Sequence, residues 1–242
     1  MAERIAVNGE SKPWGVFATF VLGAIALLVG QFSGLAAVGW WFDLDLRQIA
    51  EVSQNGGAII LFILVSAPMQ VAVLLAAASA KGNAAEYLGY KLPRHSEVVV
   101  GIAALAVLIV VGDTVSWLAG RNIVDRFQTD IYQAAQSVNL FPLLLVAITI
   151  FIPVTEESLF RGFLFRGWLK SPRHVWPTIV ATAGLFAVIH VQYDWFLIVQ
   201  VFAFGLLFGW VRWATGSTIL TMLLHALVNL EGMIETIVSS GT

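Results

Sequence analysis

Seven stretches of mostly apolar residues, each close to the length of a membrane-spanning helix, dominate this sequence of 242 residues. A helix needs about 20 such residues to cross the hydrocarbon core of a bilayer. Hydrophobic residues make up 59% of the chain and charged residues only 12%, about half the charged share of a soluble domain. No single core could bury so much apolar surface, so we predict an integral membrane protein in contact with lipid. The candidate spans are residues 15–39, 57–80, 97–119, 141–169, 176–192, 195–213 and 217–238.

The predicted fold class is all-α, a polytopic transmembrane bundle of seven to eight helices. The eighth helix arises if Pro153 splits the long fourth segment just before two carboxylates. The first apolar run, Val16–Val38, is longer than the apolar region of a signal peptide, which has roughly 7–15 residues, so we expect an uncleaved span. Cleavage near Ala36 is the alternative. Gly205 and Gly209 form a spacing typical of closely packed membrane helices.

The segment from Ile123 to Leu140 differs from the spans. Ile123, Phe127, Ile131 and Ala134 fall on one helical face, and charged residues lie elsewhere. This pattern predicts a helix at the membrane surface, with an ordered polar loop as the alternative.

Lysine and arginine in the connections predict the orientation, because cytoplasmic loops carry an excess of both. With the N-terminus in the cytoplasm, nine such residues lie inside and three outside. The inner set is Arg4, Lys12, Lys81, Lys91, Arg94, Arg166, Lys170, Arg173 and Arg212, and the outer set is Arg47, Arg121 and Arg126. A short chain with minimal loops favours a prokaryotic cell (inner) membrane. No basic block indicates a nucleic-acid partner, and the absence of cysteine excludes disulfides and thiolate chemistry.

Polar residues interrupt the later apolar segments at similar depths. Glu156 lies 17 residues before Arg173 and His190 lies 17 residues after it, where two segments turn around. At about 1.5 Å per residue, antiparallel helices place both about 25 Å from that turn. Asn229 lies about 21 Å beyond the next turn, and His225 is one turn shallower. Charged groups at membrane depth usually mark function, so we predict a catalytic cavity within the membrane.

Helical spacing assigns neighbours to these residues. Glu157 and Arg161 are four apart and can form an ion pair, whereas Glu156 points about 100° away and is free to face other segments. Phe186 is expected to form an apolar wall beside His190. A carboxylate and a histidine can hold a water molecule and take its proton, and a second imidazole with an amide N–H can stabilise an oxyanion. This equipment indicates hydrolysis of an amide bond.

Three motifs follow one another on these segments: Glu-Glu-x-x-x-Arg at 156–161, Phe-x-x-x-His at 186–190 and His-x-x-x-Asn at 225–229. Together they resemble the motifs of the CPBP group, the type II CAAX prenyl endopeptidases and their bacterial relatives, the bacteriocin-processing and self-immunity proteins. The resemblance covers about 140–232. We therefore predict N-terminal helices with the interfacial segment at 1–139 and a CPBP-like catalytic core at 140–242.

The resemblance implies an intramembrane endopeptidase whose partners are the lipid bilayer and a membrane-associated or lipidated protein or peptide. The implied roles are water activation by Glu156 and His190, oxyanion stabilisation by His225 and Asn229, and support by Glu157, Arg161 and Phe186.

The predicted mechanism is metal-free and needs no cofactor. The alternative is Zn²⁺ held by Glu156, His190 and His225, because two histidines and one carboxylate form a known catalytic set. The His-Glu-x-x-His signature of zinc proteases is absent from the sequence.

The sequence also allows two other functions. A transporter also uses buried carboxylates and histidines, but it usually has paired repeats, which this sequence lacks. A non-catalytic immunity or assembly protein has no need of water-activating groups. Taken singly, each motif also has a structural interpretation, such as a buried ion pair or hydrogen bonds between helices. Asp113, Glu231 and Glu235 are assigned to ordinary polar positions, with Asp113 as a candidate to line the cavity. The sequence does not indicate an oligomeric state.

Overall fold

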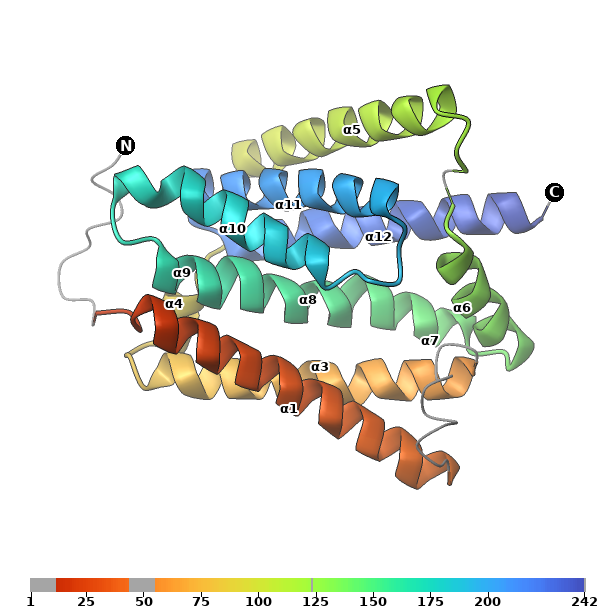
Figure 1. Cartoon of the computed structure of the whole chain (residues 1–242), viewed down its shortest axis with the longest axis horizontal. Coiled ribbons are helices and arrows are strands. Elements are labelled where there is room, and N and C mark those ends of the chain that lie inside the picture. Colours follow the sequence, from red (N-terminus) through yellow and green to blue (C-terminus); the bar gives the residue numbers. More distant parts are fainter. Residues whose placement is uncertain (1–11, 44–54, 123, 242) are drawn as a thin grey trace.

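The computed structural model describes residues 12–43, 55–122 and 124–241 (Figure 1). These ranges contain helices and no strand, so the all-α prediction is confirmed. The predictions that involve Arg4, Arg47 and Ile123 fall outside the described residues. The longer helices are α1 (Val16–Phe42), α3 (Gly56–Ser79), α5 (His95–Leu118), α6 (Arg126–Ser137), α10 (Val175–Val188), α11 (Trp195–Thr215) and α12 (Thr218–Ser240). The shorter elements are α4 (Ala84–Leu88), α7 (Phe141–Val146), η3 (Ala147–Phe151), α8 (Ile152–Glu157), η4 (Ser158–Leu164), α9 (Phe165–Trp168) and η5 (Pro172–His174).

Six helical segments of the described chain are long and apolar enough to cross a membrane. They are α1, α3, α5, the continuous stretch Phe141–Trp168, α11 and α12. The chain is therefore an integral membrane protein, but the count differs from the predicted seven to eight. The fourth span is not split, and the fifth, α10, has 14 residues. At 1.5 Å per residue it is about 21 Å long, less than the roughly 30 Å of the hydrocarbon core.

The fourth span widens instead of breaking at Pro153. The π-helical stretches η3 and η4 lie on either side of α8, which contains this proline. Proline lacks an N–H and its ring crowds the carbonyl four residues earlier, and the wider turn of η3 accommodates both effects. Such turns are rare and frequently lie at functional sites. Glu156 and Glu157 stand between the two widened stretches.

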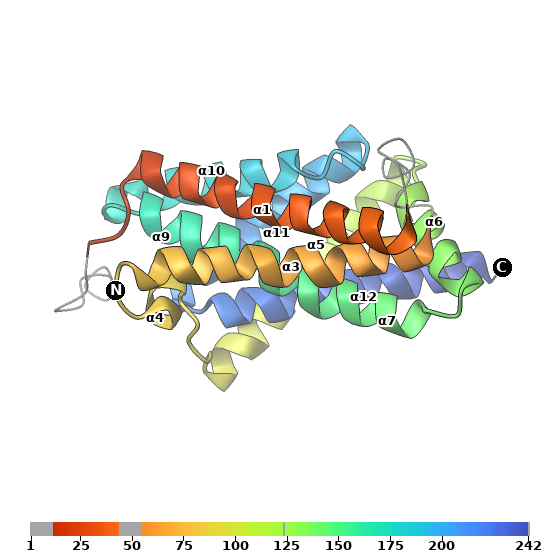
Figure 2. The same cartoon turned by 90° about the horizontal axis from the view of Figure 1, so that it is seen from below.

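Two pairs of helices approach closely through glycine. In α1, which lies along α3 (Figure 2), a Cβ atom at Gly30 would lie 2.8 Å from the Ser66 carbonyl oxygen. In α11, a Cβ at Gly205 would lie 2.9 Å from the Cβ of Ala183, and one at Gly209 would lie 3.0 Å from Ile179 of α10. Small residues allow this spacing between membrane helices. The predicted close-packing role of the Gly205 and Gly209 pair is confirmed.

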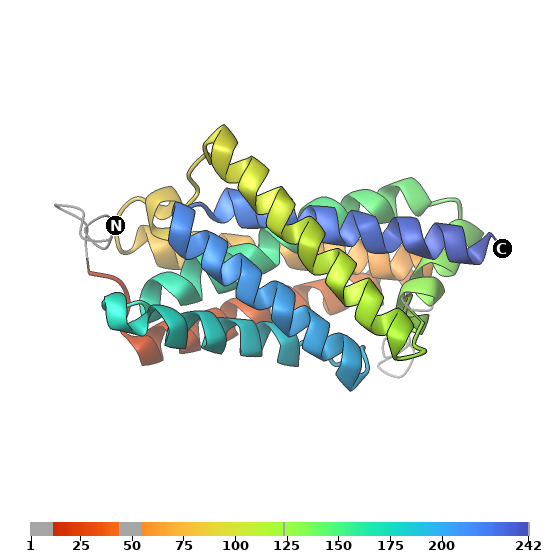
Figure 3. The same cartoon turned by 90° about the horizontal axis from the view of Figure 1, so that it is seen from above.

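Helices α5, α6, α11 and α12 pack on one side of the fourth span. Helix α5 crosses α11 and α12 obliquely (Figure 3), and the start of α1 and the end of α12 lie at opposite ends of the bundle (Figure 1). Helix α6 lies near the C-terminal end, where the Asp125 side chain accepts a hydrogen bond from the Phe127 N–H at 2.7 Å. Its Ile131 and Ala135 are buried. The segment is thus a helix, as expected, and its contact with the membrane surface stays a prediction.

Candidate active site

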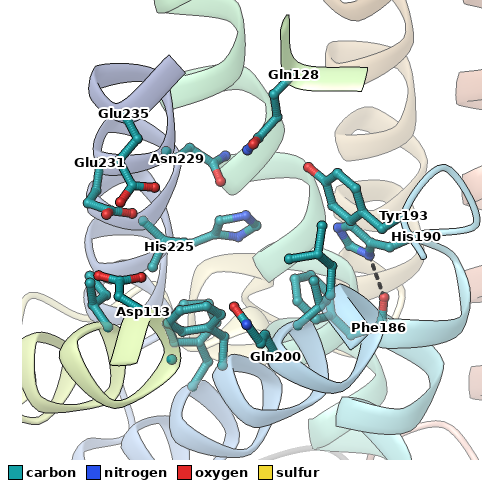
Figure 4. A pocket seen from close by; sticks show the side chains of 18 residues that line it. Asp113, Gln128, Phe186, His190, Tyr193, Gln200, His225, Asn229, Glu231 and Glu235 are labelled. Atoms are coloured by element: carbon teal, nitrogen blue, oxygen red, sulfur yellow. Dashed lines mark hydrogen bonds between the residues drawn. The ribbon is translucent and has the colours of Figure 1, made fainter. Parts of the chain in front are cut away.

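A cavity of about 140 Å³ lies between α5, α6, α11, α12 and the connection from α10 to α11 (Figure 4). One part of its wall is apolar, formed mainly by α11 and by Phe186. The polar side chains that line it are Asp113, Gln128, His190, Tyr193, Gln200, His225, Asn229, Glu231 and Glu235. Three of the four predicted catalytic residues, His190, His225 and Asn229, therefore share one cavity.

His190 lies in the turn after α10, not within a helix as the 176–192 prediction implied. Helix α10 ends at Val188, and the His190 N–H donates to the Ala187 carbonyl at 3.1 Å. The ring Nδ1 lies 2.6 Å from the Phe186 carbonyl oxygen (Figure 4). A carbonyl oxygen only accepts, so Nδ1 carries the proton of this bond and Nε2 retains its lone pair in the neutral ring. The turn thus presents a basic nitrogen at the cavity.

Glu157 and Arg161 form the predicted pair inside the bundle. Both side chains are completely buried, and Arg161 donates to Glu157 Oε1 at 2.9 Å. Arg161 also donates to the Gly205 carbonyl at 3.0 Å. Its guanidinium lies over the Phe186 ring, 4.5 Å from the centroid. The pair therefore links η4 to α11 and lies directly beneath the aromatic wall of the cavity.

His225 has a carboxylate near each ring nitrogen. Its Nδ1 lies 3.1 Å from Glu157 Oε1, and its Nε2 lies 4.0 Å from Glu156 Oε2. Phe208 stacks on the ring and Phe186 meets it edge-on. The helical spacing had paired Glu157 only with Arg161. The structure shows that the same carboxylate also orients His225.

Asn229 ties α12 to the widened part of the fourth span. Its Nδ2 donates to the Ile148 carbonyl in η3 at 2.8 Å. The rest of its amide faces the cavity (Figure 4). One N–H of Asn229 is thus occupied by the protein, and the other remains available to a ligand.

Glu156 borders His225 without lining the cavity itself. Its side chain is 22% exposed, whereas that of Glu157 is fully buried. Its Oε2 is shielded from solvent and has no hydrogen-bond partner among the described residues. An unpartnered carboxylate oxygen 4.0 Å from His225 Nε2 is free to accept a hydrogen bond from a small molecule such as water.

Several cavity residues were not foreseen. Asp113 of α5 meets Glu231 and Glu235 of α12, with one carboxylate oxygen from each within 4.8 Å of the others. From the sequence alone, Glu231 and Glu235 read as ordinary polar residues near the end of the last span. Their signal was available, because ionisable residues in a membrane span usually face a cavity. Tyr193 and Gln128 carried no such signal, since both lie in polar segments between spans.

The zinc alternative can be compared with the positions of its ligands. Within the described ranges, the group of three donors close enough to hold one metal ion is the Asp113, Glu231 and Glu235 cluster. Glu156, His190 and His225 do not form such a group. The donor atoms of this zinc set are thus not gathered around one point in the described structure, and the metal-free mechanism stays a prediction.

The fold and this cavity define a polytopic membrane protein with a polar site inside its helical bundle. The family model described as "Type II CAAX prenyl endopeptidase Rce1-like" matches residues 138–230. This match agrees with the resemblance of the three motifs to the CPBP group. Comparisons with curated proteins and with solved structures gave no match. The matched range contains all seven motif residues, from Glu156 to Asn229.

Proposed function

We propose that this protein is an intramembrane endopeptidase that hydrolyses a peptide bond with a water molecule activated by Glu156 and His190. The arrangement of the two histidines carries this proposal. Each imidazole has its Nδ1 fixed by a different protein group, and each lines the same cavity. An imidazole whose orientation is fixed on one side is prepared for chemistry on the other.

In the proposed first step, the water donates hydrogen bonds to His190 Nε2 and to the Glu156 carboxylate. Its oxygen attacks the carbonyl carbon of the scissile bond while its proton passes to Glu156. The C–N bond of the tetrahedral intermediate then breaks, and the same proton moves to the leaving nitrogen. Glu156 is suited to this exchange, because its Oε2 has no hydrogen-bond partner in the described structure. General acid–base catalysis of this kind contributes about 10²–10⁴-fold to a rate.

The carbonyl oxygen becomes negative in this step and needs hydrogen-bond donors. We assign His225 and the free N–H of Asn229 to that role. Glu157 Oε1 lies 3.1 Å from Nδ1 of His225 and holds the ring in a fixed orientation. Donors that are fixed in advance are typically the largest single contribution to such catalysis.

The substrate we propose is a membrane-associated or lipidated protein or peptide. A cavity of about 140 Å³ is smaller than the roughly 300–1,000 Å³ of pockets that enclose a whole ligand. It fits a short piece of extended chain around the scissile bond. Any lipid group on the substrate is therefore expected to stay outside the cavity, in contact with the bilayer.

The test is a comparison of membrane proteomes from cells with the wild-type protein and with Glu156→Gln, scored for new N-termini. We expect wild-type-specific termini on membrane-associated proteins. Purified protein in liposomes should cleave the corresponding peptides, and Glu156→Gln and His190→Gln should reduce turnover by at least about 10²-fold. Glu86→Gln, an exposed change in α4, is the matched control.

Full turnover by Glu156→Gln would refute the assignment. If the purified protein in liposomes transports a solute and cleaves no peptide, the result would instead support a transporter. A protein that cleaves nothing but protects cells equally well with either glutamine substitution would be an immunity protein.

A further inference from the structure

Tyr193 occupies the turn that presents His190. Its N–H donates to the His190 carbonyl at 3.1 Å. The two rings are stacked, with centroids 5.9 Å apart and an angle of 18° between their planes. From the other side, Phe127 of α6 meets the tyrosine ring edge-on at 6.3 Å. The phenol ring thus packs between the His190 ring on one side and Phe127 of α6 on the other.

The hydroxyl of Tyr193 points into the cavity, on the side where the Asn229 amide lies (Figure 4). Burial raises the pKa of this hydroxyl to about 12, and the negative charges of Asp125 and Glu156 act in the same direction, whereas a hydrogen bond with the Gln192 side chain acts against them. The group therefore stays protonated at every pH at which a cell lives. A neutral phenol in a fixed position is a hydrogen-bond donor that needs no reorganisation.

The two donors already assigned to the oxyanion are each partly occupied. Asn229 gives one N–H to the Ile148 carbonyl, and the Nδ1 of His225 faces Glu157. Each therefore offers one remaining donor at most. His225 offers it only when protonated, because the neutral ring has a single N–H.

We propose that the Tyr193 hydroxyl donates a hydrogen bond to the carbonyl oxygen of the scissile peptide bond and, with Asn229 and His225, stabilises the oxyanion. The hydroxyl keeps its proton throughout, so no further group is required. This inference rests on the proposed function, and it adds to that function a catalytic residue outside the three motifs.

The test is Tyr193→Phe, which removes the hydroxyl and keeps the ring that stacks on His190. We expect kcat to fall by about 10²-fold, the loss typical of one oxyanion donor, with KM changed less than about twofold. Tyr132→Phe is the matched control, because the Tyr132 hydroxyl accepts a bond from Gln136 on the exposed side of α6, away from the cavity. It should keep wild-type turnover.

A second measurement separates the oxyanion role from packing. A phosphinic peptide built on the identified cleavage sequence mimics the tetrahedral intermediate, and an uncleaved substrate peptide mimics the ground state. Tyr193→Phe should weaken binding of the phosphinic peptide by about the same factor as kcat and leave substrate binding unchanged.

Wild-type kcat in Tyr193→Phe, together with an inactive Glu156→Gln, would overturn the tyrosine inference alone. Equal weakening of both peptides would also overturn it, since the ring would then only shape the cavity. Wild-type turnover by Glu156→Gln would overturn the proposed function, and the tyrosine role with it.

Discussion

The Nδ1 of His225 lies 3.1 Å from Glu157 Oε1, the same oxygen that accepts the Arg161 hydrogen bond at 2.9 Å. One buried carboxylate oxygen thus serves both an ion pair and a histidine of the cavity. The ion pair alone would stabilise the fold. Its second partner connects the interior of the bundle to the proposed chemistry.

This shared oxygen predicts that stability and activity separate in a double mutant. Glu157→Gln and Arg161→Met should each cost about 3–5 kcal/mol of folding free energy, because each leaves a buried charge or its partner unpaired. The double mutant Glu157→Gln/Arg161→Met should recover most of that stability. It should stay at least about 10²-fold less active, since His225 has still lost its carboxylate. Unfolding in detergent and peptide cleavage measure the two quantities. A double mutant with restored activity would show that Glu157 has only a structural role.

The spacing of the motifs along the chain predicted a common depth, because distance from a turn translates into depth in antiparallel helices, and in the structure His190, His225 and Asn229 line one cavity. His190 shows the limit of that argument. Its depth was set by counting along a helix that in fact ends at Val188. The sequence did carry a signal for a break between α10 and α11, since Asp194 caps the start of α11 by accepting from the N–H groups of Phe196 and Leu197. The apolar run before it concealed where α10 ends.

The contacts between helices that are distant in sequence could not be predicted. Glu157 of α8 meets His225 because the packing of α8 against α12 brings these two side chains together. Spacing within one helix fixes relative directions on that helix alone. For the same reason, the sequence did not predict that Asp113 meets Glu231 or that Tyr193 and Asn229 line the same cavity.

The contact between α10 and α11 predicts unequal effects of two glycine substitutions. A Cβ at Gly205 would lie 2.9 Å from the Ala183 Cβ, whereas a Cβ at Gly184 would meet nothing within 4 Å. Gly205→Ala should therefore destabilise the protein by about 1–3 kcal/mol through overpacking. Gly184→Ala, in the middle of α10, should be neutral or stabilise by about 0.5–1 kcal/mol. Thermal unfolding in one detergent compares them, and equal effects would contradict the close approach.

The excess of lysine and arginine at one end of the bundle predicts a cytoplasmic N-terminus. The chain has no cysteine, so single cysteines can report the orientation without further changes. Ser96 lies in the first turn of α5, Asn122 lies four residues beyond its last residue, and both are exposed. In intact cells, a maleimide that cannot cross membranes should label Asn122→Cys and spare Ser96→Cys, and both should react after lysis. The reverse pattern would invert the orientation.

Removal of metal provides the sharpest test of the mechanism. Water activation by Glu156 and His190 predicts that exhaustive chelation in metal-free buffer changes kcat by less than about twofold. A zinc enzyme would lose its activity and regain it with added Zn²⁺, because bound zinc is what lowers the pKa of the attacking water. The acidic cluster of Asp113, Glu231 and Glu235 supplies a control. Among the described residues, it is the group of side chains close enough together to hold a cation. If added divalent ions change activity, the triple replacement Asp113→Asn/Glu231→Gln/Glu235→Gln should abolish that response when the cluster binds the ion. A response that persists in the triple mutant and disappears with His190→Gln would place the metal at the histidines and reverse the metal-free assignment.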